Sequence, residues 1–131
     1  MPITIDSKRK KPETIRQNFP DAIIIDVTSK GDDPWIKFSP FYPHGNIPVP
    51  FSPDYVSASV EGVWQGLKVF ATADVDVRKF DISTMRNLKR TVRKYGQVLG
   101  HRKGINGQEL LSYRDARDKL YLPTYNWILE N

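Results

Sequence analysis

The sequence predicts an α+β fold, a single helix-rich domain with a small sheet, and three observations support this. One short segment, Ala22–Thr28, is rich in β-branched residues and bounded by proline and glycine, as strands are. Several later segments repeat apolar residues at helical spacing. No linker or repeat divides the 131 residues, so we expect one domain over residues 1–131. Strands and helices do not alternate along the chain, which argues against a doubly wound sheet.

The composition excludes several classes of site. The chain has no cysteine, so disulfides, thiolate metal sites and a cysteine nucleophile are ruled out. Its two histidines, His44 and His101, are too few for a histidine-rich metal centre, and we expect neither a metal nor a cofactor. No segment approaches the roughly 20 apolar residues of a membrane span, and no signal peptide is evident. We therefore expect a cytoplasmic protein without a membrane partner.

The positive charge is concentrated in one block. The net charge is +5, and the block Arg78–Lys103 contains nine Lys or Arg residues against one acid, Asp81. Such a block attracts anionic partners through its electric field. Phosphate-bearing small molecules are one class of partner, and nucleic acid bound through Arg78–Lys103 is the other.

The first elements expected along the chain are a short helix and a strand. Pro12 can open a helix that continues to Asn18, because proline is well tolerated in a first helical turn. The nearly continuous apolar run of Ala22–Thr28 predicts a strand covered on both faces.

A rigid aromatic loop follows over Lys30–Asp54. Its six prolines forbid a long helix or a central strand, yet it also carries five aromatic residues. These rings can form a wall on which a planar ligand stacks, with Ser39, Tyr42 and His44 as polar groups. They can equally fill the protein core, and the sequence does not decide between the two.

Val56–Phe70 is expected to form the central helix, with Ser57 or Ser59 as its N-cap. Two stripes run along it besides the apolar one that faces the core. Glycines at positions 62 and 66 indicate that something packs or binds close to the backbone, because each costs an interior helix roughly 1 kcal/mol relative to alanine. The polar stripe, in which spacing alone favours a solvated ion pair, consists of Glu61, Gln65 and Lys68.

The remaining chain is expected to be loop, helix, turn and helix. A loop over Asp74–Asp81 precedes a basic amphipathic helix that Ser83 caps, running to Tyr95 with Gly96 as its stop. The glycine-rich segment Gln97–Gly107 is predicted to be a compact turn whose donors suit phosphate or ribose. A third helix then starts at position 106 or 107 and ends near position 121, and Pro123 kinks the chain or opens a fresh turn.

Two motifs together resemble the NADAR superfamily. The first is FSPFYP at Phe38–Pro43, and the second is SVEGVWQGLKVF at Ser59–Phe70. Members commonly carry a Phe-Tyr-Pro segment and then a helix of the form T-V-E-H-x-Y-Q-x-x-K, with which Glu61, Gln65 and Lys68 align. Trp64 stands at the aromatic position of that helix, and a weaker match covers residues 94–121. The resemblance implies a NADAR-like α+β domain.

The resemblance also implies an activity. NADAR proteins are N-glycosidases that act on phosphorylated riboflavin-pathway intermediates or remove ADP-ribose from a nucleobase. Cleavage of an N-ribosyl bond passes through an oxocarbenium-like state, which a carboxylate stabilises. Glu61 is accordingly the expected catalytic carboxylate, with Lys68 and Gln65 as its catalytic partners. The expected ligand-binding residues are Ser39, Tyr42, His44, Trp64, His101, Arg102 and Arg114.

The sequence departs from the family in two ways. The usual histidine after the glutamate is Gly62 here, and members generally continue past the position of Asn131 with a further helix. We therefore expect a divergent short branch, or a domain that lacks the family's C-terminal part. An inactive relative that still binds ADP-ribose is an alternative to the enzyme, as is a nucleic-acid-binding module.

Overall fold

The computed structural model describes residues 3–131, which fall into two compact units. The first unit ends at Ser39 and the second runs from Pro40 to Asn131. Helices combine with small antiparallel sheets, which confirms the α+β class. Among the described residues, no helix has both the length and the apolar character needed to cross a bilayer.

The first unit contains the predicted short helix but not the predicted strand. Helix α1 (Pro12–Asn18) begins at the proline, and a 3-10 helix η1 (Trp35–Phe38) follows later. The prediction of a strand over Ala22–Thr28 is wrong, because this segment pairs with no strand and the Ile23 side chain is 82% exposed. Its Asp26 carboxylate instead accepts hydrogen bonds from the N–H and hydroxyl of Thr28, a local turn that competes with strand pairing.

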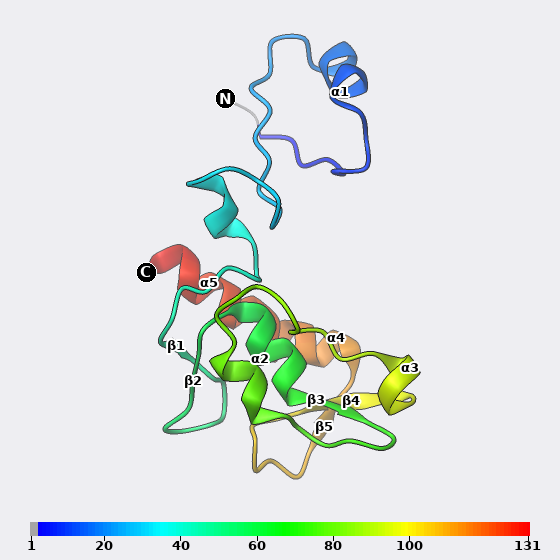
Figure 1. Ribbon diagram of the computed structural model, residues 1–131, viewed down its shortest axis with the longest axis vertical. Coiled ribbons are helices and arrows are strands. Elements are labelled where there is room, and N and C mark those ends of the chain that lie inside the picture. The colour runs from blue at the N-terminus through cyan, green and yellow to red at the C-terminus, as the bar shows by residue number, and fades with distance from the viewer. Residues whose placement is uncertain (1–2) are drawn as a thin grey trace. The chain divides into compact units, whose positions relative to one another are not determined.

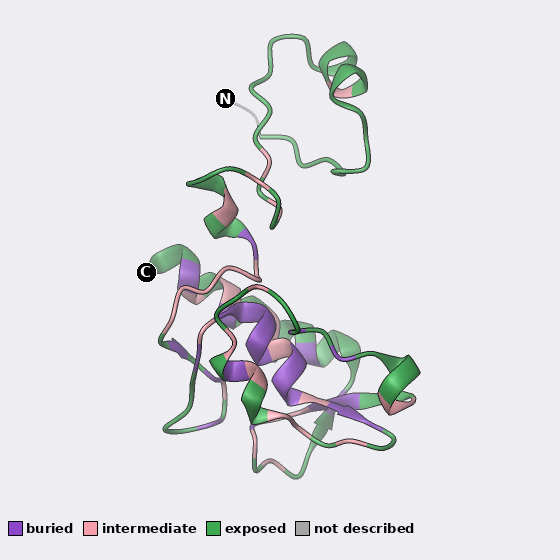
Figure 2. Ribbon diagram, in the orientation of Figure 1, coloured by how far each residue is buried: buried purple, intermediate pink, exposed green. Residues whose placement is uncertain are grey.

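The second unit is organised around α2 (Val60–Leu67), the most continuously buried helix in Figure 2. The Ser59 hydroxyl accepts a hydrogen bond from the Gly62 N–H, which confirms Ser59 as the N-cap. The prediction of a helix over the whole of Val56–Phe70 is wrong at both ends. At Lys68 the backbone turns to an extended conformation and the chain enters a strand (Figure 1).

Two small antiparallel sheets surround α2. One pairs β1 (Ile47–Pro48) with β2 (Val56–Ser57), so the first residues of the predicted central helix belong to a strand. The other has the order β3 (Lys68–Phe70), β4 (Val98–Arg102) and β5 (Leu110–Leu111). The predicted turn over Gln97–Gly107 therefore contains a strand in its first half, because it pairs with β3.

The predicted glycine stripe is explained by η2 (Val77–Asp81), a 3-10 helix in the segment expected to be a loop. A Cβ atom on Gly62 would lie 2.7 Å from the carbonyl oxygen of Lys79, and one on Gly66 would lie 2.5 Å from the Phe80 ring. Both distances are below any normal contact, so η2 packs where side chains would otherwise stand. The Phe80 ring joins Val63 and Leu67 in the main core of the unit.

The predicted basic helix from Ser83 to Tyr95 is mostly absent. Only α3 (Val92–Tyr95) is helical, and Met85 and Asn87 have positive φ angles of 64° and 62°, which an α-helix excludes. The apolar face proposed for this helix is not buried as a face, since Leu88 is buried but Val92 is 59% exposed. Gly96, at φ 85°, ends α3 as predicted.

The last part of the chain is a continuous helical segment with a π-helical turn. It comprises α4 (Tyr113–Ala116), η3 (Arg117–Tyr121) and α5 (Leu122–Glu130). The expected helix start at position 106 or 107 is wrong, because β5 precedes the helix and the Ser112 hydroxyl caps it. Pro123 is the second residue of α5 and directly follows the π-helical turn, so it neither ends the helical segment nor begins a separate one.

Candidate functional site

The site begins with two buried polar side chains on α2. Glu61 is 8% exposed and Gln65, one helical turn later, is 4% exposed. The Gln65 Nε2 atom donates a hydrogen bond of 2.8 Å to Glu61 Oε1, and the Glu61 backbone N–H donates to the Pro40 carbonyl at 2.8 Å. The Glu61 Oε2 atom receives no hydrogen bond from another described residue. Glu61 is therefore a fixed carboxylate with one oxygen available.

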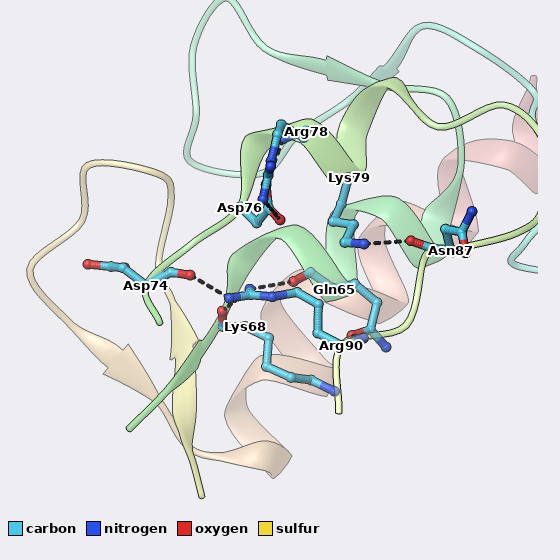
Figure 3. Close-up of polar contacts among 8 residues, drawn as sticks. All are labelled: Gln65, Lys68, Asp74, Asp76, Arg78, Lys79, Asn87 and Arg90. Carbon is cyan, nitrogen blue, oxygen red and sulfur yellow. Dashed lines mark hydrogen bonds and ion pairs between the residues drawn. The ribbon is translucent and has the colours of Figure 1, made fainter. Parts of the chain in front are cut away.

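Arg90 holds both Gln65 and the end of α2 (Figure 3). Its backbone N–H donates to Gln65 Oε1 at 3.0 Å, which fixes the orientation of the amide toward Glu61. Its guanidinium donates to the carbonyl oxygens of Gln65 at 3.0 Å, Lys68 at 2.6 Å and Asp74 at 2.7 Å. The first two are carbonyls at the C-terminal end of the helix, where a cation is favoured. Arg90 therefore sets how Lys68 leaves the helix relative to Glu61.

The sequence gives no sign of this role, because Arg90 is one of nine Lys or Arg residues in the block Arg78–Lys103. The side chain is 6% exposed, and its guanidinium lies over the rings of Phe70 at 4.8 Å and Tyr95 at 5.2 Å. Burial lowers the pKa of Arg90, although the carboxylate of Asp76 opposes this shift. No spacing in the sequence separates this arginine from its exposed neighbours.

Lys68 lies near Glu61 but not on the helical stripe that the sequence predicted. It is the first residue of β3, and its ammonium group is half-buried. Burial lowers the pKa of Lys68, the Glu61 carboxylate opposes that shift, and Arg90 and Lys89 reinforce it. Gln65 is therefore hydrogen-bonded to Glu61, whereas Lys68 acts on Glu61 by charge alone and from a strand rather than from the helix face.

His101 stands directly opposite Lys68 in the β3–β4 pair, so their side chains project from the same face of the sheet. The imidazole is 2% exposed and packs on the Trp64 ring with a centroid distance of 3.8 Å. Burial lowers the pKa of His101 to about 4, and the Lys68 charge adds to this shift. Both ring nitrogens are buried without a hydrogen bond of normal geometry to a described residue, although a backbone contact with Trp64 slightly opposes the lowering of the pKa. His101 is therefore a neutral imidazole at neutral pH.

Two tyrosines complete the aromatic side of the site. The rings of Tyr113 and Tyr121 meet the Trp64 ring edge-on, at centroid distances of 5.9 and 5.5 Å. Burial raises the pKa of Tyr121 to about 12, and the negative charge of Glu61 adds to the shift. Tyr121 therefore keeps its hydroxyl proton and can donate a hydrogen bond. In the sequence, Tyr121 stands near the expected end of the third helix, and no spacing relates it to the predicted site.

The structure decides between the two interpretations of the glycine stripe. Gly62 and Gly66 were predicted to admit something that either packs or binds close to the helix backbone. The Phe80 ring and the Lys79 carbonyl already occupy that face, so the glycines serve internal packing and do not line a ligand site.

The structure gives the surroundings of the other predicted ligand-binding residues, each within its own unit. The Arg102 guanidinium makes two hydrogen bonds of 3.0 Å to the Asp74 carboxylate and a third to a backbone carbonyl. Arg114 is an exposed residue of α4. The rings of Tyr42 and His44 contact each other edge-on at 4.9 Å, and Ser39 is the last residue of the first unit.

The described surface has hollows elsewhere. One is lined by residues 48–56 around the β1–β2 connection, and another by residues of η3 and α5 such as Leu122 and Tyr125. Neither is lined by Glu61, Lys68 or His101. The described residues also include no group of three or more side chains suited to hold a metal ion.

Comparison with known proteins gives a family without an activity. A model of a family described as being of unknown function (DUF6939) matches residues 7–131. No curated protein and no solved structure matches the chain.

Proposed function

We propose that this chain, which belongs to the DUF6939 family, is a NADAR-like N-glycosidase. Its substrate is an ADP-ribose conjugate or a phosphorylated ribosyl-base intermediate. The observation that carries the proposal is Glu61, a buried carboxylate with one oxygen bound by Gln65 and the other available, in the field of Lys68. A carboxylate held in this way is what an oxocarbenium-like transition state requires.

The proposed reaction replaces the N-ribosyl bond by a C–O bond. The bond between the ribosyl carbon and the base nitrogen breaks, and its electron pair stays on that nitrogen. A water oxygen then attaches to the ribosyl carbon, and its proton passes to Glu61 Oε2. Gln65 holds the other carboxylate oxygen, so the attacking geometry is fixed before the reaction starts.

Lys68 has a second part in this scheme. Its ammonium group can donate a proton to the departing base nitrogen or bind a phosphate. The lowered pKa of Lys68 makes this proton easier to transfer than that of an exposed lysine.

Two other functions follow from the sequence. An inactive relative that binds ADP-ribose would use the same residues without turnover. A nucleic-acid-binding module would use the Arg78–Lys103 block, but the predicted basic helix there is largely absent. Several cations of the block also bind the protein itself, and these are Arg78, Lys79, Arg90, Arg102 and Lys103.

A turnover assay tests the enzyme directly. The protein is incubated with ADP-ribosylated guanine or a ribosylaminopyrimidine phosphate, and the released base is measured by chromatography. Glu61→Gln should lower the rate by roughly 100-fold or more, because the catalytic carboxylate is lost while its shape remains. Glu109→Gln is the matched control, since Glu109 is an exposed acid 3.8 Å from Lys103 and should leave the rate unchanged.

The same experiment separates the alternatives. A Glu61→Gln variant as active as the parent would refute the role of Glu61. Binding of ADP-ribose in a calorimeter without turnover of either substrate would identify the inactive relative. A gel shift of DNA or RNA at low salt would favour the nucleic-acid module if it weakens steeply with added salt and is the same for Glu61→Gln and the parent.

A further inference from the structure

We propose that Lys68 and Lys89 form a phosphate-binding pair beside Glu61. This inference rests on the proposed function and names the part of the substrate that the pair recognises. Lys89 had no individual role in the sequence analysis, in which it was one cation of the basic block.

The first step is an excess of positive charge around Lys68. The charges of Lys89 and Arg90 repel the Lys68 ammonium and lower its pKa, whereas the Glu61 carboxylate attracts it and raises the pKa. Two further acids in the region are engaged elsewhere, since Asp74 binds Arg102 and Asp76 binds Arg78. Part of this cluster is half-buried, where charges are screened less than in water. An anion would relieve the repulsion.

The second step is which cations are available. The Arg90 guanidinium is held by three backbone carbonyls, so it serves the fold. The ammonium groups of Lys68 and Lys89 make no hydrogen bond or ion pair with any described residue. Each lies instead beside an aromatic ring, Lys68 at 5.9 Å from the Phe70 centroid and Lys89 at 5.7 Å from the Phe41 centroid. Their N–H donors are therefore available to a ligand.

The third step is the position of Lys89 relative to the carboxylate. The carbonyl of Pro40 accepts the Glu61 N–H, so the neighbouring Phe41 lies at the start of α2. The Lys89 head group lies over Phe41, and the next backbone N–H along the chain, that of Arg90, binds the Gln65 amide. Lys89 therefore runs along the side of α2 that carries Glu61 and Gln65, and Lys68 follows at the end of the same helix.

The chemistry of the pair favours phosphate. Two ammonium groups without carboxylate partners suit a group that carries up to two negative charges and several acceptor oxygens. The neighbouring His101 is neutral and would not add charge to this contact. The arrangement thus places phosphate at the lysines and the ribosyl carbon toward Glu61.

Calorimetric titration of the full chain tests the pair with four ligands: ADP-ribose, ribose 5-phosphate, inorganic phosphate and adenosine. Lys89→Gln should weaken binding of the phosphate-bearing ligands by about tenfold or more and leave adenosine binding within twofold. The matched control is Lys94→Gln, because Lys94 is an exposed lysine of the same block that also lies over a ring, 5.2 Å from the Tyr95 centroid. The control should leave all four affinities within twofold.

The outcomes separate this inference from the function on which it rests. The pair would be overturned if Lys89→Gln bound every phosphate-bearing ligand as tightly as the parent does. It would also be overturned if the variant lost as much affinity for adenosine as for the phosphate-bearing ligands. Failure of the parent to bind or turn over any ribosyl ligand would overturn the proposed function, while binding of inorganic phosphate that Lys89→Gln removes would still support the pair. A loss for ribose 5-phosphate alone would assign a terminal monophosphate, and a loss for ADP-ribose alone a diphosphate ester. Melting curves show whether both variants fold. Both side chains are exposed, so we expect the melting temperatures of the variants to match that of the parent.

Discussion

Helix α2 and the segment Ser83–Thr91 carry similar patterns in the sequence but fold differently. Each has apolar residues at helical spacing with a serine before them. Only α2 becomes a helix, with a cap at Ser59 and side chains buried on nearly every side. The Ser83–Thr91 segment is irregular, with two residues at positive φ.

The difference shows what an apolar stripe needs. The apolar residues of α2 meet the core formed with Phe80 and Leu111, and its glycines admit η2 at short range. Tertiary packing, more than intrinsic propensity, supplies the stability of such short helices. The Ser83–Thr91 segment buries Leu88 and Arg90, and its main polar anchor on α2 is Arg90. One region is held over its whole length, and the other mainly at one point.

Replacing the anchor should break this arrangement most severely. Arg90→Met removes the donors to three carbonyl groups and should destabilise the protein by about 3–5 kcal/mol, because buried acceptors lose their partners. Arg93→Met is the control on an exposed neighbour and should change stability by about 0.5 kcal/mol or less. Urea denaturation of both variants measures the difference. Equal stability of the two would show that Arg90 does not anchor the segment.

The features of the fold that the sequence predicted correctly depend on contacts between neighbouring residues in the chain. Capping by Ser59, the start of α1 at Pro12 and the stop at Gly96 each depend on a residue and its immediate neighbours. The end of α2 depends instead on pairing of Lys68 with His101, which lie 33 positions apart in the sequence. The strand expected at Ala22–Thr28 failed for the same reason, because β-branched residues form a strand only where another strand pairs with them.

The same distinction between local and long-range contacts applies to the residues of the candidate site. Glu61 and Gln65 were predictable together, because they lie one turn apart on the same helix. Arg90 and Tyr121 reach the cluster from distant segments, and no spacing rule relates them to Glu61. Arg102 was expected to bind a ligand, and in the structure its guanidinium binds the carboxylate of Asp74, which no spacing rule relates to it.

The free energy of unfolding measured as a function of pH tests whether His101, on the aromatic side of α2, is shielded from solvent. The pKa of His101 is lowered from 6.5 to about 4 in the folded state, so the unfolded chain binds more protons between these values. Stability from this group is complete above pH 6.5 and decreases as the pH falls toward 4, by about 3 kcal/mol in total. Urea denaturation at a series of pH values measures the slope. His101→Phe should flatten it in that range, and an unchanged slope would mean that His101 titrates as an exposed group.

The smallest expected effect tests the fit between α2 and η2. Alanine is a better helix former than glycine by about 1 kcal/mol, so Gly66→Ala would stabilise the protein if the position were open. The new Cβ would instead lie 2.5 Å from the Phe80 ring, and overpacking of this kind costs about 1–3 kcal/mol. We therefore expect a net loss of up to about 2 kcal/mol in thermal or urea denaturation, instead of the gain expected at an open position. The double variant Gly66→Ala/Phe80→Leu should lose less than the sum of its single changes, because the smaller side chain makes room for the added methyl group. Strict additivity would show that η2 does not press on this glycine, and the close packing that distinguishes α2 from Ser83–Thr91 would need another origin.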